Sequence, residues 1–191
     1  MVLRIAFKEW AAVCQALMAG RQSIILRKGG IAEEAGEFRP EFPRFWLYPT
    51  YIHQQDTGLK PTETHWLTLA RHNAPAAAKI VLRAWCEVGP IEYCDRLDRL
   101  QSLADWHIWS ETTVMQRFQY RRPGLYILPV RVYLCSQPIE LIERPEYAGC
   151  KTWVEFGAES AREFSEQPAT PVLTTPAYHA LLQALQERQD G

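Results

Sequence analysis

The apolar segments of this chain are short, and that feature limits the possible folds more than any other. Runs such as residues 23–26 and 125–134 have the length of β-strands, and none approaches the ~20 residues of a membrane-spanning helix. Strand-like runs alternate irregularly with short helical patterns, unlike the uniform crossovers of βαβ units. The pattern predicts an α+β domain, built on a small twisted or barrel-like mixed sheet with peripheral helices.

Hydrophobic periodicity assigns most of the elements. The strands are expected at residues 23–28, 45–48, 79–88, 125–135 and 152–156. Short helices are expected at residues 64–71 and 95–103, and from a Ser110 N-cap to about residue 118. The spacing between Phe7 and Ala19 favours a helix, although two strands joined at residues 19–22 are an alternative. Pro129 predicts an edge or a bulge in its strand.

The domain boundaries follow from the turn residues. Residues 1–156 are expected to form a single α+β core domain, and residues 157–175 a polar linker. A C-terminal helix at 176–189, with Thr175 and Pro176 at its N-cap and N1 positions, is expected to pack on the core. The composition, 47% apolar and 23% charged, excludes a disordered, collagen-like or coiled-coil chain.

Charge and cysteine usage indicate the cellular setting. The N-terminus carries charges where a signal peptide is apolar, so we expect a cytoplasmic protein without membrane contact. The five cysteines lack CxxC spacing, which favours buried free thiols over a disulfide framework or zinc site. The net charge is −1, but residues 132–191 carry nine acidic and four basic side chains. This acidic C-terminal third is a candidate surface for a protein partner.

Cations, glycines and aromatic rings gather in two segments some twenty positions apart. Glycines allow close approach of the backbone to an anion, and rings offer surfaces on which bases stack. Their combination predicts a site for single-stranded nucleic acid or a nucleobase. The candidate binding residues are Arg27, Lys28, Gly29, Gly30, Trp46, Tyr48, Thr50, Tyr51, His53 and Gln54, with Arg121 and Arg122 as a further phosphate-binding pair.

A catalytic alternative rests on histidines and carboxylates. His53 or His107, paired with Glu33 or Asp105, would suit a hydrolase or nuclease, with or without a divalent metal. No P-loop, GxGxxG, GxSxG or HExxH motif is present, and no histidine pair has i,i+4 spacing. We therefore predict no metal site and no cofactor, and the residues do not decide whether the protein is an enzyme. A non-catalytic protein-interaction domain is the third alternative.

The sequence resembles an uncharacterised family found largely in cyanobacteria, domain of unknown function 1802. The similarity lies in five segments: a KEWA opening at residues 8–11, LRKGGI at 26–31, FWLYPTYxHQ at 45–54, HIWS at 107–110 and GCKTWV at 149–154. The resemblance spans nearly the whole chain and implies no particular reaction.

A weaker resemblance concerns the fold. The order of helix, glycine, Arg-bearing strand and aromatic strand is similar to the opening of PUA-like barrels, which include the ASCH and EVE domains. These domains cradle nucleobases or RNA, so the resemblance implies a PUA-like architecture. Residues 20–27 match the glycine and the final arginine of the ASCH motif GxKxxExR, but not its lysine or glutamate. ASCH-type activity is therefore not implied.

Overall fold

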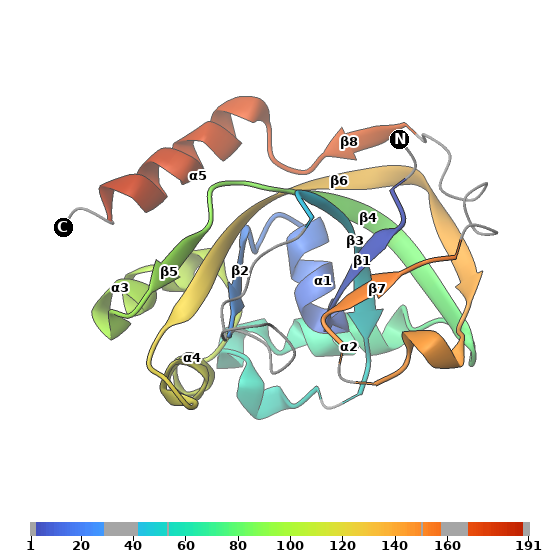
Figure 1. Ribbon diagram of the computed structural model, residues 1–191, viewed down its shortest axis with the longest axis horizontal. Coiled ribbons are helices and arrows are strands. Elements are labelled where there is room, and N and C mark those ends of the chain that lie inside the picture. Colours follow the sequence, from blue (N-terminus) through green and yellow to red (C-terminus); the bar gives the residue numbers. More distant parts are fainter. Residues whose placement is uncertain (1–2, 29–41, 53, 150, 158–167, 189–191) are drawn as a thin grey trace.

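A strongly curled sheet arches over a buried helix (Figure 1). The computed structural model describes residues 3–28, 42–52, 54–149, 151–157 and 168–188. The strand order is β2-β6-β4-β3-β1-β7, and β5 and β8 also pair with β6. The strands are β1 (Ile5–Trp10), β2 (Ile24–Arg27), β3 (Arg44–Thr50), β4 (Lys79–Val88), β5 (Glu92–Cys94), β6 (Leu125–Ile142), β7 (Trp153–Glu155) and β8 (Ala169–Pro171). This half-barrel with surrounding helices is the expected mixed α+β architecture.

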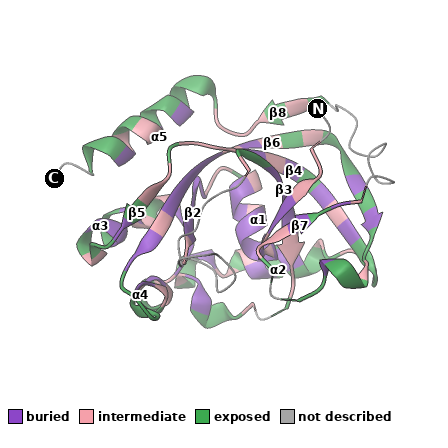
Figure 2. Cartoon of the chain, viewed as in Figure 1, coloured by how far each residue is buried: buried purple, intermediate pink, exposed green. Residues whose placement is uncertain are grey.

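Five α-helices accompany the sheet in the described ranges. They are α1 (Ala11–Met18), α2 (His65–His72), α3 (Leu97–Ser102), α4 (Glu111–Gln119) and α5 (Thr175–Glu187). α1 lies under the arch and buries six of its residues, whereas α5 lies on the other side of β6 (Figures 1 and 2). As predicted, Ser110 caps α4, its Oγ accepting a hydrogen bond from the Thr113 amide at 3.2 Å. None of these helices combines the length and apolar character needed to cross a membrane.

The predicted helix from Phe7 to Ala19 is wrong in its first third. Residues Ile5–Trp10 form β1, and the helix begins only at Ala11. β1 pairs in parallel with β3 and antiparallel with β7, so both of its edges are hydrogen-bonded. Its apolar residues follow no clean alternation because Ala6 and Phe7, which point to opposite faces, are both buried. Pairing with distant strands therefore overrides the helical spacing.

The prediction for Pro129 is also corrected. β6 continues to Ile142, beyond the expected end at residue 135, and has partners on both sides. Pro129 lies inside this strand, at the last pair with β2, and the β4 ladder begins at Val130. Because Pro129 stands where one ladder ends and the next begins, a missing N–H is tolerated there without an edge or a bulge.

The C-terminal part differs from the expectation in two details. Residues 169–171 of the expected linker form β8 against β6, and residues 158–167 lie outside the described residues. The cap of α5 is Thr174, whose Oγ1 accepts from the Ala177 amide at 3.3 Å, and not Thr175. The apolar face of α5 joins the main core through Tyr178, Leu181 and Leu185. α5 therefore offers no bare apolar stripe of the kind that a partner-docking helix would present.

Candidate functional site

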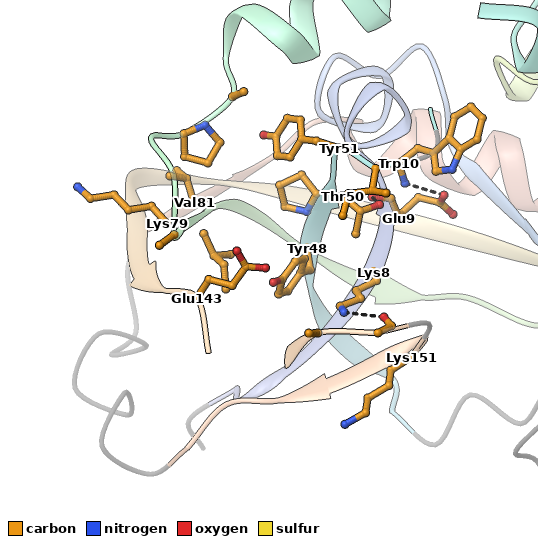
Figure 3. Close-up of a pocket in the computed structure, with 18 of the residues that line it drawn as sticks. Lys8, Glu9, Trp10, Tyr48, Thr50, Tyr51, Lys79, Val81, Glu143 and Lys151 are labelled. Atoms are coloured by element: carbon orange, nitrogen blue, oxygen red, sulfur yellow. Dashed lines mark hydrogen bonds between the residues drawn. The ribbon is translucent and has the colours of Figure 1, made fainter. Parts of the chain in front are cut away.

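A cleft of about 720 Å³ opens where β1 and β3 end (Figure 3). The two strands are parallel and pair Lys8 with Tyr48 and Trp10 with Thr50, so their carboxyl ends reach the same edge of the sheet. Residues 74–81 and the segment before β7 supply the other walls. A volume of this size is typical of small-molecule and cofactor sites.

The rim of the cleft is basic. Lys79 and Lys151 extend outward on different sides of the cleft (Figure 3), and both side chains are exposed. Lys8 is held in place, since its Nζ donates to the carbonyls of Gly149, at 3.1 Å, and Tyr147. Together with Arg27 and Arg117, these lysines give the described lining five cations against two carboxylates. The cleft therefore attracts anionic or polar ligands rather than cationic ones.

Aromatic rings form part of the wall. Tyr48 and Tyr51 come from the end of β3 and the residue after it, and Trp10 from the end of β1. The Lys8 ammonium lies 5.3 Å from the centroid of the Tyr48 ring. Burial raises the pKa of Tyr48 and of Tyr51, so both phenols stay neutral and can donate a hydrogen bond at neutral pH.

A cluster of charged residues, Glu9, Arg27 and Arg117, also belongs to the lining. Glu9 is only 4% exposed, and its Oε1 accepts from the Trp10 amide at 2.8 Å. Its Oε2 lies 3.9 Å from Nη1 of Arg27, which is too long for a hydrogen bond, and has no hydrogen-bond partner in the described structure. Arg117 stacks on the Trp109 ring at 3.7 Å, and burial lowers the pKa of its guanidinium to about 10, against the attraction of Glu9.

Four of the predicted binding residues meet in this cleft. Arg27, Tyr48, Thr50 and Tyr51 all line it, so the two predicted segments do converge. Nη2 of Arg27 donates to Oγ1 of Thr152 at 2.9 Å, and Oγ1 of Thr50 donates to the Glu9 carbonyl at 3.0 Å. The cleft therefore holds four of the predicted residues, whereas Glu9, Arg117 and the lysines of its lining were not predicted.

Three predicted residues serve the fold instead. Trp46 is buried, and its Nε1 donates to the carbonyl of Leu3 at 2.8 Å. Oε1 of Gln54 accepts from the amide of Ala12 at 2.9 Å, which satisfies a free N–H in the first turn of α1. Lys28 points away from the cleft. Its Nζ donates to the carbonyls of Phe118 and Gly124, each at 2.9 Å, and of Arg122.

The remaining predicted binding residues do not reach the cleft or are not described. Arg121 and Arg122 are exposed in the turn after α4, over the rings of Tyr120 and Tyr93 at 5.2 and 5.8 Å. Gly29, Gly30, Glu33 and His53 lie outside the described residues.

His107 does not have the geometry of a general base. Its ring is buried, and neither nitrogen has a hydrogen-bond partner in the described structure, so it is not paired with Asp105. Burial, reinforced by the nearby cations Lys60 and Arg21, lowers the pKa of His107 to about 3. A neutral, enclosed imidazole without a carboxylate partner lacks what the catalytic alternative requires of it.

Sequence reasoning missed Lys8, Glu9, Lys79, Arg117 and Lys151. Lys8 and Glu9 were assigned to a helix, which hid that they stand at the end of a strand beside Tyr48. A signal was nevertheless present, because residues 8–11, 26–31, 45–54 and 149–154 were singled out by resemblance, and each contributes to the cleft. Arg117 and Lys79 had no comparable signal.

Comparison with solved structures identifies the fold. The crystal structure of ASCH from Zymomonas mobilis matches with a TM-score of 0.51 over 86% of this chain and 95% of that chain, at 14% identity. A serine-to-alanine variant of the same protein matches with a TM-score of 0.50 and 13% identity, over 85% of this chain and 96% of that one. The chain therefore has the PUA-like fold of ASCH domains. At this level of identity the likeness defines the fold alone.

The family assignment is direct. The model of the family described as Domain of unknown function (DUF1802) matches residues 6–184, and the chain belongs to that family. No curated protein matches the sequence. Both resemblances noted in the sequence, to this family and to ASCH-type architecture, are confirmed.

Proposed function

We propose that this protein is a nucleic-acid-binding module that holds a nucleobase, or a short single strand, in the cleft at the ends of β1 and β3. The observation that carries the proposal is that exposed lysines and aromatic rings line the same 720 Å³ hollow. Cations that follow a phosphate backbone, next to rings on which bases stack, are the shared features of single-strand binding sites.

The electrostatics of the cleft agree with this ligand. Lys79 and Lys151 are exposed at the rim, where charged phosphates can stay partly hydrated. The half-buried Tyr51 and the more deeply buried Tyr48 lie further in, where a base would leave water. The likeness to ASCH domains supports the proposal through the shared architecture alone, since PUA-like domains cradle nucleobases or RNA.

The test is binding of fluorescently labelled ten-nucleotide single strands, measured by anisotropy at several salt concentrations. The logarithm of affinity should fall linearly with the logarithm of salt concentration, with a slope of about −0.7 per phosphate contact. The double variant Lys79→Ala/Lys151→Ala removes two contacts and should therefore reduce the size of the slope by about 1.4.

The matched control is Arg121→Ala/Arg122→Ala, which removes two exposed cations outside the cleft lining and should leave the slope unchanged. Absence of binding by the parent protein, or equal effects of the two double variants, would contradict the proposed site.

A further inference from the structure

A second, much smaller hollow lies beside the cleft, where β3 and β4 separate. The pairing of these two strands ends at Trp46 and Trp85, and Pro49, further along β3, has no N–H with which to continue a ladder. Pro49, Tyr51 and Val81 line both the cleft and the second hollow, so the two adjoin. The second hollow measures about 10 Å³, which is room for one water-sized group and too little for a base.

Three residues that line the second hollow carry polar side chains without a partner. They come from three different elements, Gln15 from α1, Asn73 from the C-cap of α2 and Arg83 from β4. Within the described ranges none of these side chains makes a hydrogen bond or an ion pair. The amides are half-buried and the guanidinium is exposed, so the group of donors is open to solvent on one side.

Arg83 stands at an irregularity of its strand. The register of β4 with β6 shifts between Leu82 and Ala84, so the ladder is interrupted at Arg83. Irregularities of this kind redirect a side chain and are frequent next to binding sites. Burial raises the pKa of Tyr51, and the positive charge of Arg83 opposes this rise. The guanidinium therefore lies within electrostatic reach of the phenol that separates the two hollows.

The carboxylate closest in effect to Arg83 is already engaged. The pKa of Glu140 is lowered by a hydrogen bond to Lys79 and by the charge of Lys79, and Arg83 adds a smaller contribution. Nζ of Lys79 lies 2.9 Å from Oε2 of Glu140, whereas Glu140 and Arg83 form no ion pair in the described structure. The charge of Arg83 is therefore available to an external anion.

We propose that the second hollow is a phosphate subsite, at which Arg83, Gln15 and Asn73 bind the phosphodiester next to the base in the cleft. The inference rests on the proposed function and adds the place of a further phosphate contact to it. One phosphate oxygen has the size of a water molecule and fits the hollow, while the other oxygens stay in solvent. A planar guanidinium suits this group because it can donate two parallel hydrogen bonds to it.

The subsite also gives the bound strand a path. Lys151 and Tyr51 lie on opposite sides of the cleft (Figure 3). Arg83 lies beyond Tyr51, on the far side from the cleft, because it lines only the second hollow of the two. The backbone then runs from Lys151 across the cleft and over Tyr51 to Arg83.

The first experiment removes the cation. Arg83→Ala deletes one phosphate contact, so in the anisotropy assay with ten-nucleotide strands the size of the salt slope should fall by about 0.7. At about 0.1 M salt the same loss corresponds to about fivefold weaker binding. Arg83→Lys keeps the charge and should keep the slope. The matched control Arg122→Ala removes an exposed cation outside both hollows and should change neither quantity.

A second pair of variants adds a charge instead. Gln15→Glu has nearly the same shape as the parent side chain and brings a carboxylate into the second hollow, where it competes with phosphate for Arg83. Binding should again weaken by about fivefold, since one phosphate contact is lost. Gln186→Glu adds the same charge at an exposed position of α5, on the other side of β6, and should stay within about twofold of the parent protein because salt screens distant charges.

The outcomes separate the subsite from the proposed function. If the parent protein binds single strands and Arg83→Ala keeps its salt slope, the phosphate subsite is wrong while binding in the cleft stands. Equal weakening by Gln15→Glu and Gln186→Glu assigns the effect to net charge and also overturns the subsite. If the parent protein binds no strand, both proposals are wrong. Should Arg83→Ala lack a thermal unfolding transition, the comparison of Gln15→Glu with Gln186→Glu decides.

Discussion

The cleft at the ends of β1 and β3 and the turn that follows α4 both combine cations with aromatic rings. In the turn, Lys28 donates to backbone carbonyls, and Arg121 and Arg122 lie against tyrosine rings. In the cleft, Tyr51 and Lys151 face a hollow of about 720 Å³. The two regions contain the same residue types, so composition cannot separate them. What separates them is the shape of the surface, because only the cleft is a hollow that can enclose a ligand.

The largest effect is expected when one aromatic ring is removed from each region in turn. Tyr51→Ala removes a ring from the cleft wall and should weaken single-strand binding by about 30-fold, since a stacked base is worth about 2 kcal/mol. Tyr120→Ala removes an exposed ring from the turn and should leave the dissociation constant unchanged. Anisotropy titration measures both, and Tyr51→Phe, which keeps the ring, should bind as the parent protein does. Equal losses in the two alanine variants would remove the distinction between the regions.

A substitution of Lys28 tests whether the cations near the turn after α4 stabilise the fold and do not bind a ligand. Lys28→Met keeps the length of the side chain but removes the charged donor to the carbonyls at the end of α4. We expect the free energy of unfolding in urea to fall by about 1.5 kcal/mol, because the carbonyls of Phe118 and Gly124 lose a charged partner. Binding of single strands should not change. If Lys28→Met has the stability of the parent protein but binds single strands more weakly, Lys28 contributes to binding and the prediction is wrong.

His107 gives the smallest of these effects, and its sign follows from the direction of its pKa shift. Its pKa is about 3 in the folded chain against 6.5 in a model peptide, so the unfolded chain binds the proton more readily. The neutral form of His107 therefore favours the folded chain fully above pH 6.5, and this contribution to the free energy of unfolding is lost as the pH falls towards 3. Between pH 7 and pH 5.5 the free energy of unfolding of the parent protein should fall by about 1 kcal/mol. The free energy of unfolding of His107→Leu should not show this fall.

The control for His107 is His179→Leu, which removes an exposed imidazole on α5. This variant should follow the pH dependence of the parent protein in urea titrations. If His107→Leu loses as much stability between pH 7 and pH 5.5 as the parent protein, the loss comes from other titratable groups.

Much of the architecture was predictable because local signals and tertiary structure agree. Ser110 forms its cap from local sequence alone, and the apolar run at Ile24–Arg27 predicts a buried strand, which it forms at the end of the sheet beside β6. The prediction failed where long-range pairing decides. Residues 7–10 belong to a stretch with helical spacing, but two distant strands are hydrogen-bonded to both edges of this segment. For the same reason the predicted site held Tyr48 and Tyr51 but lacked Glu9, which reaches the cleft only through the parallel pairing of β1 with β3.

The sequence by itself determined the α+β class, the family and the two segments whose rings and cations meet, because these depend on residue types and their order. Only the tertiary structure decided that Lys28 supports a turn while Arg27, its neighbour, lines the cleft. Arg27 is the last residue of β2 and Lys28 the first after it, so these two neighbours in the chain enter different surroundings. Which of them a ligand can reach depends on the strands and helices packed around each face.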